Sequence, residues 1–263
     1  MATEITTKPT PPDQLPPAEV EEEELAQMGF WDHINELRDR LVKIMLAVGL
    51  GMLVSAFFTN QVLEVMIQSY GEPLRTTSPT ESVTVFFKVV LMLGAILASP
   101  LITYQIFMFV MPGLTQRERR WVFLALPGTT GLFIIGLLFT WVFLIPAYVG
   151  FLRDFQSNVF QALWTADSYI GFLTAVLFYH AAAFEAPLVF YVLARGGFVT
   201  AGQMITYWRQ AVIGAAIVAA VITPTIDPVT MLMITGVLLG LYILSIFLVA
   251  FAQRRSPLHQ PIA

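Results

Sequence analysis

Residues 229–252 read VTMLMITGVLLGLYILSIFLVAFA, a stretch without a single charged side chain. As an α-helix it would extend about 36 Å, more than the roughly 30 Å of hydrocarbon in a bilayer. Similar apolar stretches recur toward the N-terminus, separated by short clusters of charged residues. Of the 263 residues, 57% are hydrophobic and 12% are charged, whereas soluble domains carry about 25% charged residues. The sequence therefore predicts an all-α polytopic membrane protein.

The apolar stretches predict six transmembrane helices with both chain ends in the cytoplasm. The predicted segments are Leu41–Phe58, Val83–Met111, Trp121–Val149, Ser168–Ala194, Tyr207–Ile222 and Val229–Ala252. Arginine and lysine concentrate in alternate loops, and the positive-inside rule assigns those loops to the cytoplasm. The basic residues on that side are Arg38, Arg40, Lys43, Arg117, Arg119, Arg120, Arg195, Arg209, Arg254 and Arg255, against Arg75, Arg153 and Lys88 on the other.

Two regions of the predicted topology differ from a simple series of membrane-spanning helices. Ahead of the first segment, apolar residues at spacings of three and four predict a short amphipathic helix at the membrane surface over Phe30–Leu41. The fifth segment has an uninterrupted apolar run, Ala211–Ile222, that would span only roughly 18 Å as a helix. Either this helix is short and the bilayer or the protein adapts to it, or Tyr207 and Trp208 add another turn.

The chain divides into an acidic, proline-rich tail over residues 1–26, a membrane domain over 27–255 and a short cytoplasmic tail over 256–263. The first tail includes the run Glu21–Glu24 and predicts a disordered, solvated segment, with non-specific attraction of basic peptides as the alternative. The chain has no cysteine, no nucleotide-binding P-loop and no histidine cluster with metal-ligand spacing. We therefore predict no cofactor, no ATP site and no enzymatic activity.

Two glutamates near predicted helix starts have both a structural and a functional interpretation. Glu36 precedes Arg40 by four residues, so the two could form an ion pair on a solvated helix face. Glu118 follows Thr115 by three residues, which is the spacing of a capping box. Spacing alone favours the structural interpretation for both.

Glu185 lies inside the fourth apolar segment, in Phe184-Glu185-Ala186-Pro187. A carboxylate at this depth costs about 3 kcal/mol or more, so it should face the protein interior or a water-filled cavity, which favours a function. Pro187 has no N–H to donate, so we expect a kink beside the acid. His180 lies five residues earlier, off the same face, and a pair with Glu185 is not assured.

Prolines and capping residues mark further helix boundaries. Asp227 is placed to cap the sixth helix, with Pro228 at its first position and Thr223-Pro224 closing the fifth. Ser78 and Glu81, with Pro79 at the first helical position, predict the start of the second helix. The remaining prolines are interpreted as helix stops or kinks: Pro73, Pro100, Pro127 and Pro146.

Taken in order, these motifs resemble the TatC family of twin-arginine translocases. The string from His33 to Leu41, HINELRDRL, is similar to the family's H-x-x-E-L-R-x-R-L. Further matches are Ser99-Pro100 with Tyr104-Gln105 and Phe109, then Pro112-Gly113-Leu114, Glu118-Arg119-Arg120, the F-E-x-P motif ending at Pro187 and the T-P-x-x-D-P motif from Thr223 to Pro228. The resemblance runs from about Phe30 to Arg255 and implies a cup-like bundle of six helices.

The resemblance implies a receptor that binds the twin-arginine signal peptides of folded proteins, without nucleic acid, in the inner membrane of a prokaryote. It implies assembly with single-span TatA and TatB subunits and with further copies of the chain, and transport driven by the proton-motive force. The resemblance assigns signal-peptide binding to Glu36, Glu118, Arg38 and Arg119. It assigns partner contact within the bilayer to Glu185, Thr223 and Asp227. It assigns structural roles to Pro73, Pro100, Phe109 and Pro187. Some family members carry glutamine where this chain has Met231, so a polar contact is not expected there.

Two other functions would also use Glu185. A secondary transporter could use it as a proton site, but that class often shows inverted repeats, and none is clear in this sequence. An intramembrane enzyme would need a second catalytic group at a recognisable spacing, and none is found. Both rank below the receptor.

Overall fold

The structure, a computed structural model, describes residues 30–70, 74–110, 116–155, 157–159, 163–222 and 227–254. Within these ranges the side chains of residues 30, 31, 110, 116–125 and 254 are outside the description. The predicted tails at 1–26 and 256–263 also lie outside it, as do Pro73 and Thr223.

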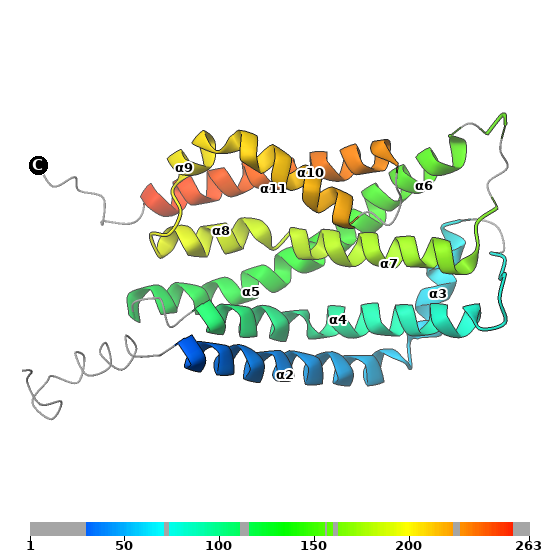
Figure 1. Ribbon diagram of the computed structural model, residues 1–263, viewed down its shortest axis with the longest axis horizontal. Coiled ribbons are helices and arrows are strands. Elements are labelled where there is room, and N and C mark those ends of the chain that lie inside the picture. The colour runs from blue at the N-terminus through cyan, green and yellow to red at the C-terminus, as the bar shows by residue number, and fades with distance from the viewer. Residues whose placement is uncertain are drawn as a thin grey trace, which may run out of the picture.

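The described residues form a bundle of helices that run along one long axis (Figure 1). The helices are α2 Phe30–Ser55, α3 Thr59–Gln68, α4 Glu81–Val110, α5 Gln116–Phe139, the π-helical turn η3 Thr140–Leu144, α6 Ile145–Asp154, α7 Ala166–Ala183, α8 Ala186–Arg195, α9 Ala201–Thr206, α10 Trp208–Ile222 and α11 Pro228–Arg254. Figure 1 shows the start of α2, the end of α4, the start of α5 and the end of α8 at one end of the bundle. At the opposite end lie α3, the start of α4 and the start of α7.

Among the described residues, four helical segments are long and apolar enough to cross a membrane: Glu81–Phe109, Leu126–Asp154, Ala166–Arg195 and Pro228–Gln253. The pair α2 and α3, bent by 76°, makes a fifth if counted as one span. Both alternatives for the fifth segment hold in part, because α10 starts three residues before the apolar run and its 15 residues still extend only about 22 Å. Trp208 joins this helix, whereas Tyr207 stays in the turn before it.

The prediction was wrong about the start of the membrane domain. The expected surface helix over Phe30–Leu41 and the first membrane helix form one continuous helix, α2. Ile34, Leu37 and Leu41 are 41%, 44% and 54% exposed, so the apolar stripe faces away from the protein. In a bilayer such a stripe meets lipid, and the polar side of the helix can turn inward.

The chain then bends sharply into α3, a helix that the sequence analysis did not predict. This helix holds Asn60, Gln61 and Glu64 among its apolar residues, so it is too polar to be recognised as part of a membrane span. Met66 and Tyr70 at its far end are buried and belong to the main core, which α4, α6 and α7 also line. Packing against those helices therefore holds α3 across the end of the bundle.

The prolines affect their helices in different ways. Pro100 and Pro127 lie inside α4 and α5, and neither ends its helix. Pro146 falls in the first turn of α6, directly after the π-helical turn. At Pro187 the structure goes further than the expected kink, because a two-residue turn separates α7 from α8 and Pro187 stands in the first turn of α8.

The cap predicted at Asp227 is confirmed, whereas the capping box predicted for Ser78 and Glu81 is only half formed, because the Ser78 hydroxyl accepts from the Thr80 N–H instead. The Asp227 Oδ1 atom accepts a hydrogen bond from the Thr230 N–H at 2.6 Å, at the start of α11. The Glu81 carboxylate accepts from the Ser78 N–H at 3.3 Å, although α4 begins at Glu81 rather than at Pro79. Glu81 Oε1 also accepts from the Asp167 N–H at 2.9 Å. Glu81 thereby ties the start of α4 to the start of α7.

Glycines allow α2 and α4 to approach closely. A Cβ atom at Gly94 on α4 would lie 2.7 Å from the backbone nitrogen of Met52 on α2, and one at Gly51 would collide with the carbonyl group of Gly94. Small residues at such a contact let two membrane helices pack backbone to backbone. The contact also brings the N-terminal half of α2 alongside the C-terminal half of α4.

We expect Gly51→Ala to destabilise the protein by about 1–3 kcal/mol, because one methyl group cannot enter this contact without shifting backbone atoms. Gly49 on the same helix is a matched control, since a Cβ atom there would meet nothing within 4 Å. Gly49→Ala should be neutral or slightly stabilising. Thermal unfolding of the two variants in detergent checks the prediction, and equal midpoints would contradict it.

Candidate functional site

A cluster of polar and aromatic side chains joins α2 to α4 at the end of the bundle where α5 starts. Glu36 and Arg40, one helical turn apart on α2, form an ion pair, with Arg40 Nε donating to Glu36 Oε1 at 2.9 Å. Arg40 Nη1 also donates to Gln105 Oε1 on α4 at 3.2 Å. The predicted pair is confirmed, but it is not on a solvated face, because the two side chains are only 17% and 15% exposed.

The second carboxylate oxygen of Glu36 is the unusual atom of this cluster. Oε2 is buried and has no hydrogen-bond partner among the described residues. Nδ1 of His33 lies 3.8 Å from Oε2, which is beyond hydrogen-bond distance. A buried acceptor that has no hydrogen-bond donor costs about 1–3 kcal/mol of stability. Within the described part of the chain, this oxygen therefore lacks the donor that its burial requires.

An aromatic pair stands next to this carboxylate. His33 stacks on Phe109 of α4 with ring centroids 4.3 Å apart and an interplanar angle of 21°. Phe109, predicted to be structural, therefore also forms a wall of the site. His33, Glu36 and Arg40 lie three and four residues apart, so they share one face of α2. That spacing was the sequence signal that could have added His33 and Arg40 to the candidate residues.

The other predicted signal-binding residues are placed differently. Arg38 is 70% exposed and pairs with its neighbour Asp39 at 3.1 Å, so the structure does not bring it to Glu36. Glu118 and Arg119 fall near the start of α5, at the same end of the bundle as Glu36. Their side chains lie outside the described residues, as does the expected capping box with Thr115.

Glu185 occupies the break between α7 and α8. The Thr103 hydroxyl on α4 donates to its two carboxylate oxygens, which lie 2.9 and 3.1 Å away. Glu185 also lines a groove of about 360 Å³, together with Ser99, Ile106, Phe133, Phe178 and Phe190. As expected, the acid faces protein and a cavity rather than lipid alone.

His180 does not take part in that contact. Its Nδ1 atom lies 2.8 Å from the carbonyl oxygen of Val176, and its Nε2 atom lies 3.3 Å from the Tyr148 hydroxyl. A buried imidazole with these two partners is a structural residue of the core. Within the described part of the chain, no three histidine, aspartate or glutamate side chains gather as a metal site would require.

Comparison with known proteins identifies the family. A family model described as Sec-independent protein translocase protein (TatC) matches residues 32–236. The chain is 35% identical to TatC of Synechocystis sp., with 90% of this chain and 92% of that protein covered. It is also 35% identical to the chloroplastic TATC of Oryza sativa subsp. japonica, of which it spans 64% of the length.

A solved structure supports the same assignment. The crystal structure of a twin-arginine translocase receptor, TatC, superposes with a TM-score of 0.75 at 34% sequence identity. The match covers 84% of this chain and 100% of that chain. The chain therefore belongs to the TatC family of Sec-independent protein translocases.

Proposed function

We propose that this chain is the signal-reading receptor of a twin-arginine translocase, which binds the arginine pair in the leader peptides of folded proteins. The observation that carries the proposal is the buried Oε2 atom of Glu36, which has no hydrogen-bond partner among the described residues. It lies within the motif HINELRDRL. The solved neighbour that superposes on this chain is described as a receptor.

The chemistry of Glu36 favours arginine over lysine. Guanidinium presents a planar fork of N–H donors that matches a carboxylate, whereas the lysine ammonium is a compact point charge. Arg40, held in turn by Gln105, fixes the Glu36 side chain before a ligand arrives. Less side-chain entropy is then lost on binding.

Two guanidinium groups need more than one acid. Glu36 is already paired with Arg40, so it cannot balance two further cations. Glu118 lies near the start of α5, at the same end of the bundle. We assign it to the second arginine of the leader, with Arg119 beside it in the binding motif. Arg38, exposed and paired with Asp39, has at most a role at the rim of the site.

The receptor would work as the core of a larger complex in the bilayer. Its partners would be single-span TatA-type and TatB-type subunits and further copies of itself, and the proton-motive force rather than ATP would drive transport. The groove at Glu185 suits a partner helix that carries a polar side chain, because a hydrogen bond across helices offsets the cost of burying both groups. Thr223 and Asp227 would mark a second partner contact at the turn before α11.

The topology that goes with this function has six spans and both termini in the cytoplasm of a prokaryotic cell. The bent pair α2 and α3 and the short helix α10 would then each count as one span. The cytoplasmic end is the one that carries Glu36, because the basic loops belong to it. Arg195 at that end donates to the carbonyl oxygen of Ala252 at 3.2 Å, which holds α8 against the end of α11.

Replacing Glu36 by alanine should weaken binding of a twin-arginine leader peptide about ten- to hundredfold, the effect of losing one charge-assisted hydrogen-bond pair. Glu118→Ala should act in the same direction. Membrane insertion should be unaffected in both variants. Photo-crosslinking or fluorescence titration with a labelled leader measures the change.

Asp39→Asn is the matched control for this experiment, since Asp39 is a neighbouring acid that is exposed and pairs with Arg38. It should leave the affinity within about threefold of the wild-type value. A leader whose two arginines are replaced by lysines should bind the wild type as weakly as the alanine variants bind the original leader. Undiminished crosslinking in both alanine variants would refute the assigned roles.

Glu185→Leu should abolish the contact with a single-span partner while leader binding at Glu36 persists. The reason is that leucine cannot accept a hydrogen bond from a polar side chain of the partner helix. Thr103→Val is the companion variant, because it removes the internal donor and leaves the carboxylate in place. The Thr103→Val variant should retain the crosslink to the partner. Site-specific photo-crosslinking measures both variants. Equal crosslinking in Glu185→Leu and the wild type would exclude this contact.

Single cysteines test the topology without background, because the chain has none of its own. A membrane-impermeant maleimide added outside intact cells should label Ser157→Cys, in the connection between α6 and α7, and should spare Gly202→Cys in α9. Both positions are exposed. Labelling of Gly202→Cys from outside would overturn the proposed orientation.

A further inference from the structure

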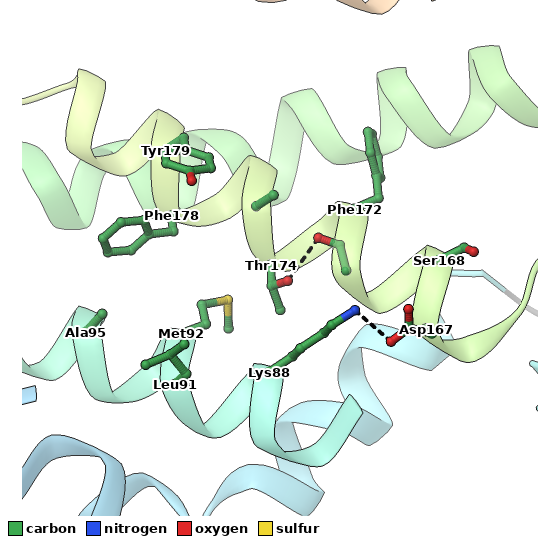
Figure 2. Close-up of a pocket in the computed structure, with 12 residues that line it drawn as sticks. Lys88, Leu91, Met92, Ala95, Asp167, Ser168, Phe172, Thr174, Phe178 and Tyr179 are labelled. Atoms are coloured by element: carbon green, nitrogen blue, oxygen red, sulfur yellow. Dashed lines mark hydrogen bonds and ion pairs between the residues drawn. The ribbon is translucent and has the colours of Figure 1, made fainter. Parts of the chain in front are cut away.

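A groove of about 850 Å³ runs between α4 and α7, and the receptor proposal makes no use of it. Figure 2 shows its two walls, with Lys88, Leu91, Met92 and Ala95 on α4 and the residues of α7 opposite them. It begins where α4 and α7 start, at the opposite end of the bundle from Glu36. The groove at Glu185 is a neighbour of this groove, and Phe178 lines both.

One end of the groove carries a pair of opposite charges. Lys88 Nζ lies 2.6 Å from Asp167 Oδ1, and the two side chains are 38% and 42% exposed. Asp167 is held in place by Glu81, which accepts its backbone N–H. A Cβ atom at Gly171 would lie 3.4 Å from Lys88 Nζ, so the ammonium group rests directly over the α7 backbone. The charge pair is thus fixed and still accessible.

The rest of the groove is apolar and open to the side. Leu91, Met92 and Ala95 form one wall, and Phe172 and Phe178 contribute to the other. Leu91 is 52% exposed and Tyr179 is 43% exposed, so the lining faces the region that lipid fills. The groove therefore has charged side chains at one end and an apolar channel along the rest, as a phospholipid has a charged headgroup and apolar chains.

The depth of the Lys88–Asp167 pair in the bilayer also fits a lipid site. The 30 residues of α4 extend about 45 Å, which matches a bilayer including its headgroup layers. Lys88 lies about 10 Å along α4 from Glu81, close to the boundary between headgroups and hydrocarbon. A phospholipid places its phosphate at this level and its acyl chains toward the middle of the bilayer.

We propose that this groove binds a phospholipid with an ethanolamine headgroup. The phosphate accepts from the Lys88 ammonium, the lipid ammonium donates to the Asp167 carboxylate, and one acyl chain lies along Leu91, Met92 and Phe178. Charge complementarity selects this lipid class. A purely anionic headgroup has no cation to pair with the Asp167 carboxylate, which would repel it. A choline headgroup is cationic but has no N–H to donate to that carboxylate.

The test uses the full chain, delipidated in detergent and mixed with phosphatidylethanolamine, phosphatidylcholine or phosphatidylglycerol of identical acyl chains. Retained lipid is counted by native mass spectrometry. The wild type should retain the ethanolamine lipid with about tenfold preference over the choline lipid, the effect of one charge-assisted hydrogen bond. The combination of Lys88→Met with Asp167→Asn should remove the preference.

Two further variants make the result decisive. Arg209→Met is the matched control, because Arg209 is a cation over the Trp208 ring at the start of α10, away from the groove, and its loss should leave retention unchanged. Ala95→Trp fills the apolar channel without touching the charge pair, and it should reduce retention of all three lipids even if the double variant fails to fold. Equal retention of the three lipids by the wild type overturns the proposal, because the charge pair would then select no headgroup. No leader peptide enters the experiment, so its outcome is independent of the receptor proposal.

Discussion

A polar side chain that leaves water for the hydrocarbon of a bilayer must find its partner inside the protein, and this requirement organises the bundle. Three of the side-chain contacts that meet it share one helix, α4. Gln105 of α4 accepts from Arg40 of α2, Thr103 of α4 donates to Glu185, and Lys88 of α4 pairs with Asp167 of α7. With the glycine contact at Gly94, these bonds make α4 the element against which α2 and α7 are positioned.

The arrangement places different chemistry at different levels of α4. The candidate receptor site stands at one end, the Thr103–Glu185 contact lies further along, and the Lys88–Asp167 pair stands near the other end. Each of the last two borders a largely apolar groove, and Phe178 lines both grooves. Thr103 and Gln105 are only two residues apart, so they point to different faces of α4 and meet different helices. A single long helix can therefore carry the proposed receptor site, the proposed partner contact and the proposed lipid site.

The irregular segments of the bundle have local and non-local causes. The break at Glu185 follows from Pro187, which cannot donate a backbone hydrogen bond, and the sequence shows it directly. The bend of 76° between α2 and α3 has no proline at its three turn residues, 56–58. A contact with another helix stabilises it instead. Ser55, the last residue of α2, donates through its hydroxyl to the carbonyl oxygen of Val90 on α4 at 2.9 Å. Such a bend depends on a partner that lies far away in the sequence.

The sequence by itself determined the apolar segments, the distortion beside Pro187 and the cap at Asp227, because periodicity and capping act within a few residues. It also marked Glu36 and Glu185 as acids that needed an explanation. Only the tertiary structure decided that α2 is continuous, that Arg38 faces outward, and which groups the acids meet. The deciding contacts join residues 65 to 82 positions apart, and a helical pattern fixes which face is polar without saying which helix that face will meet.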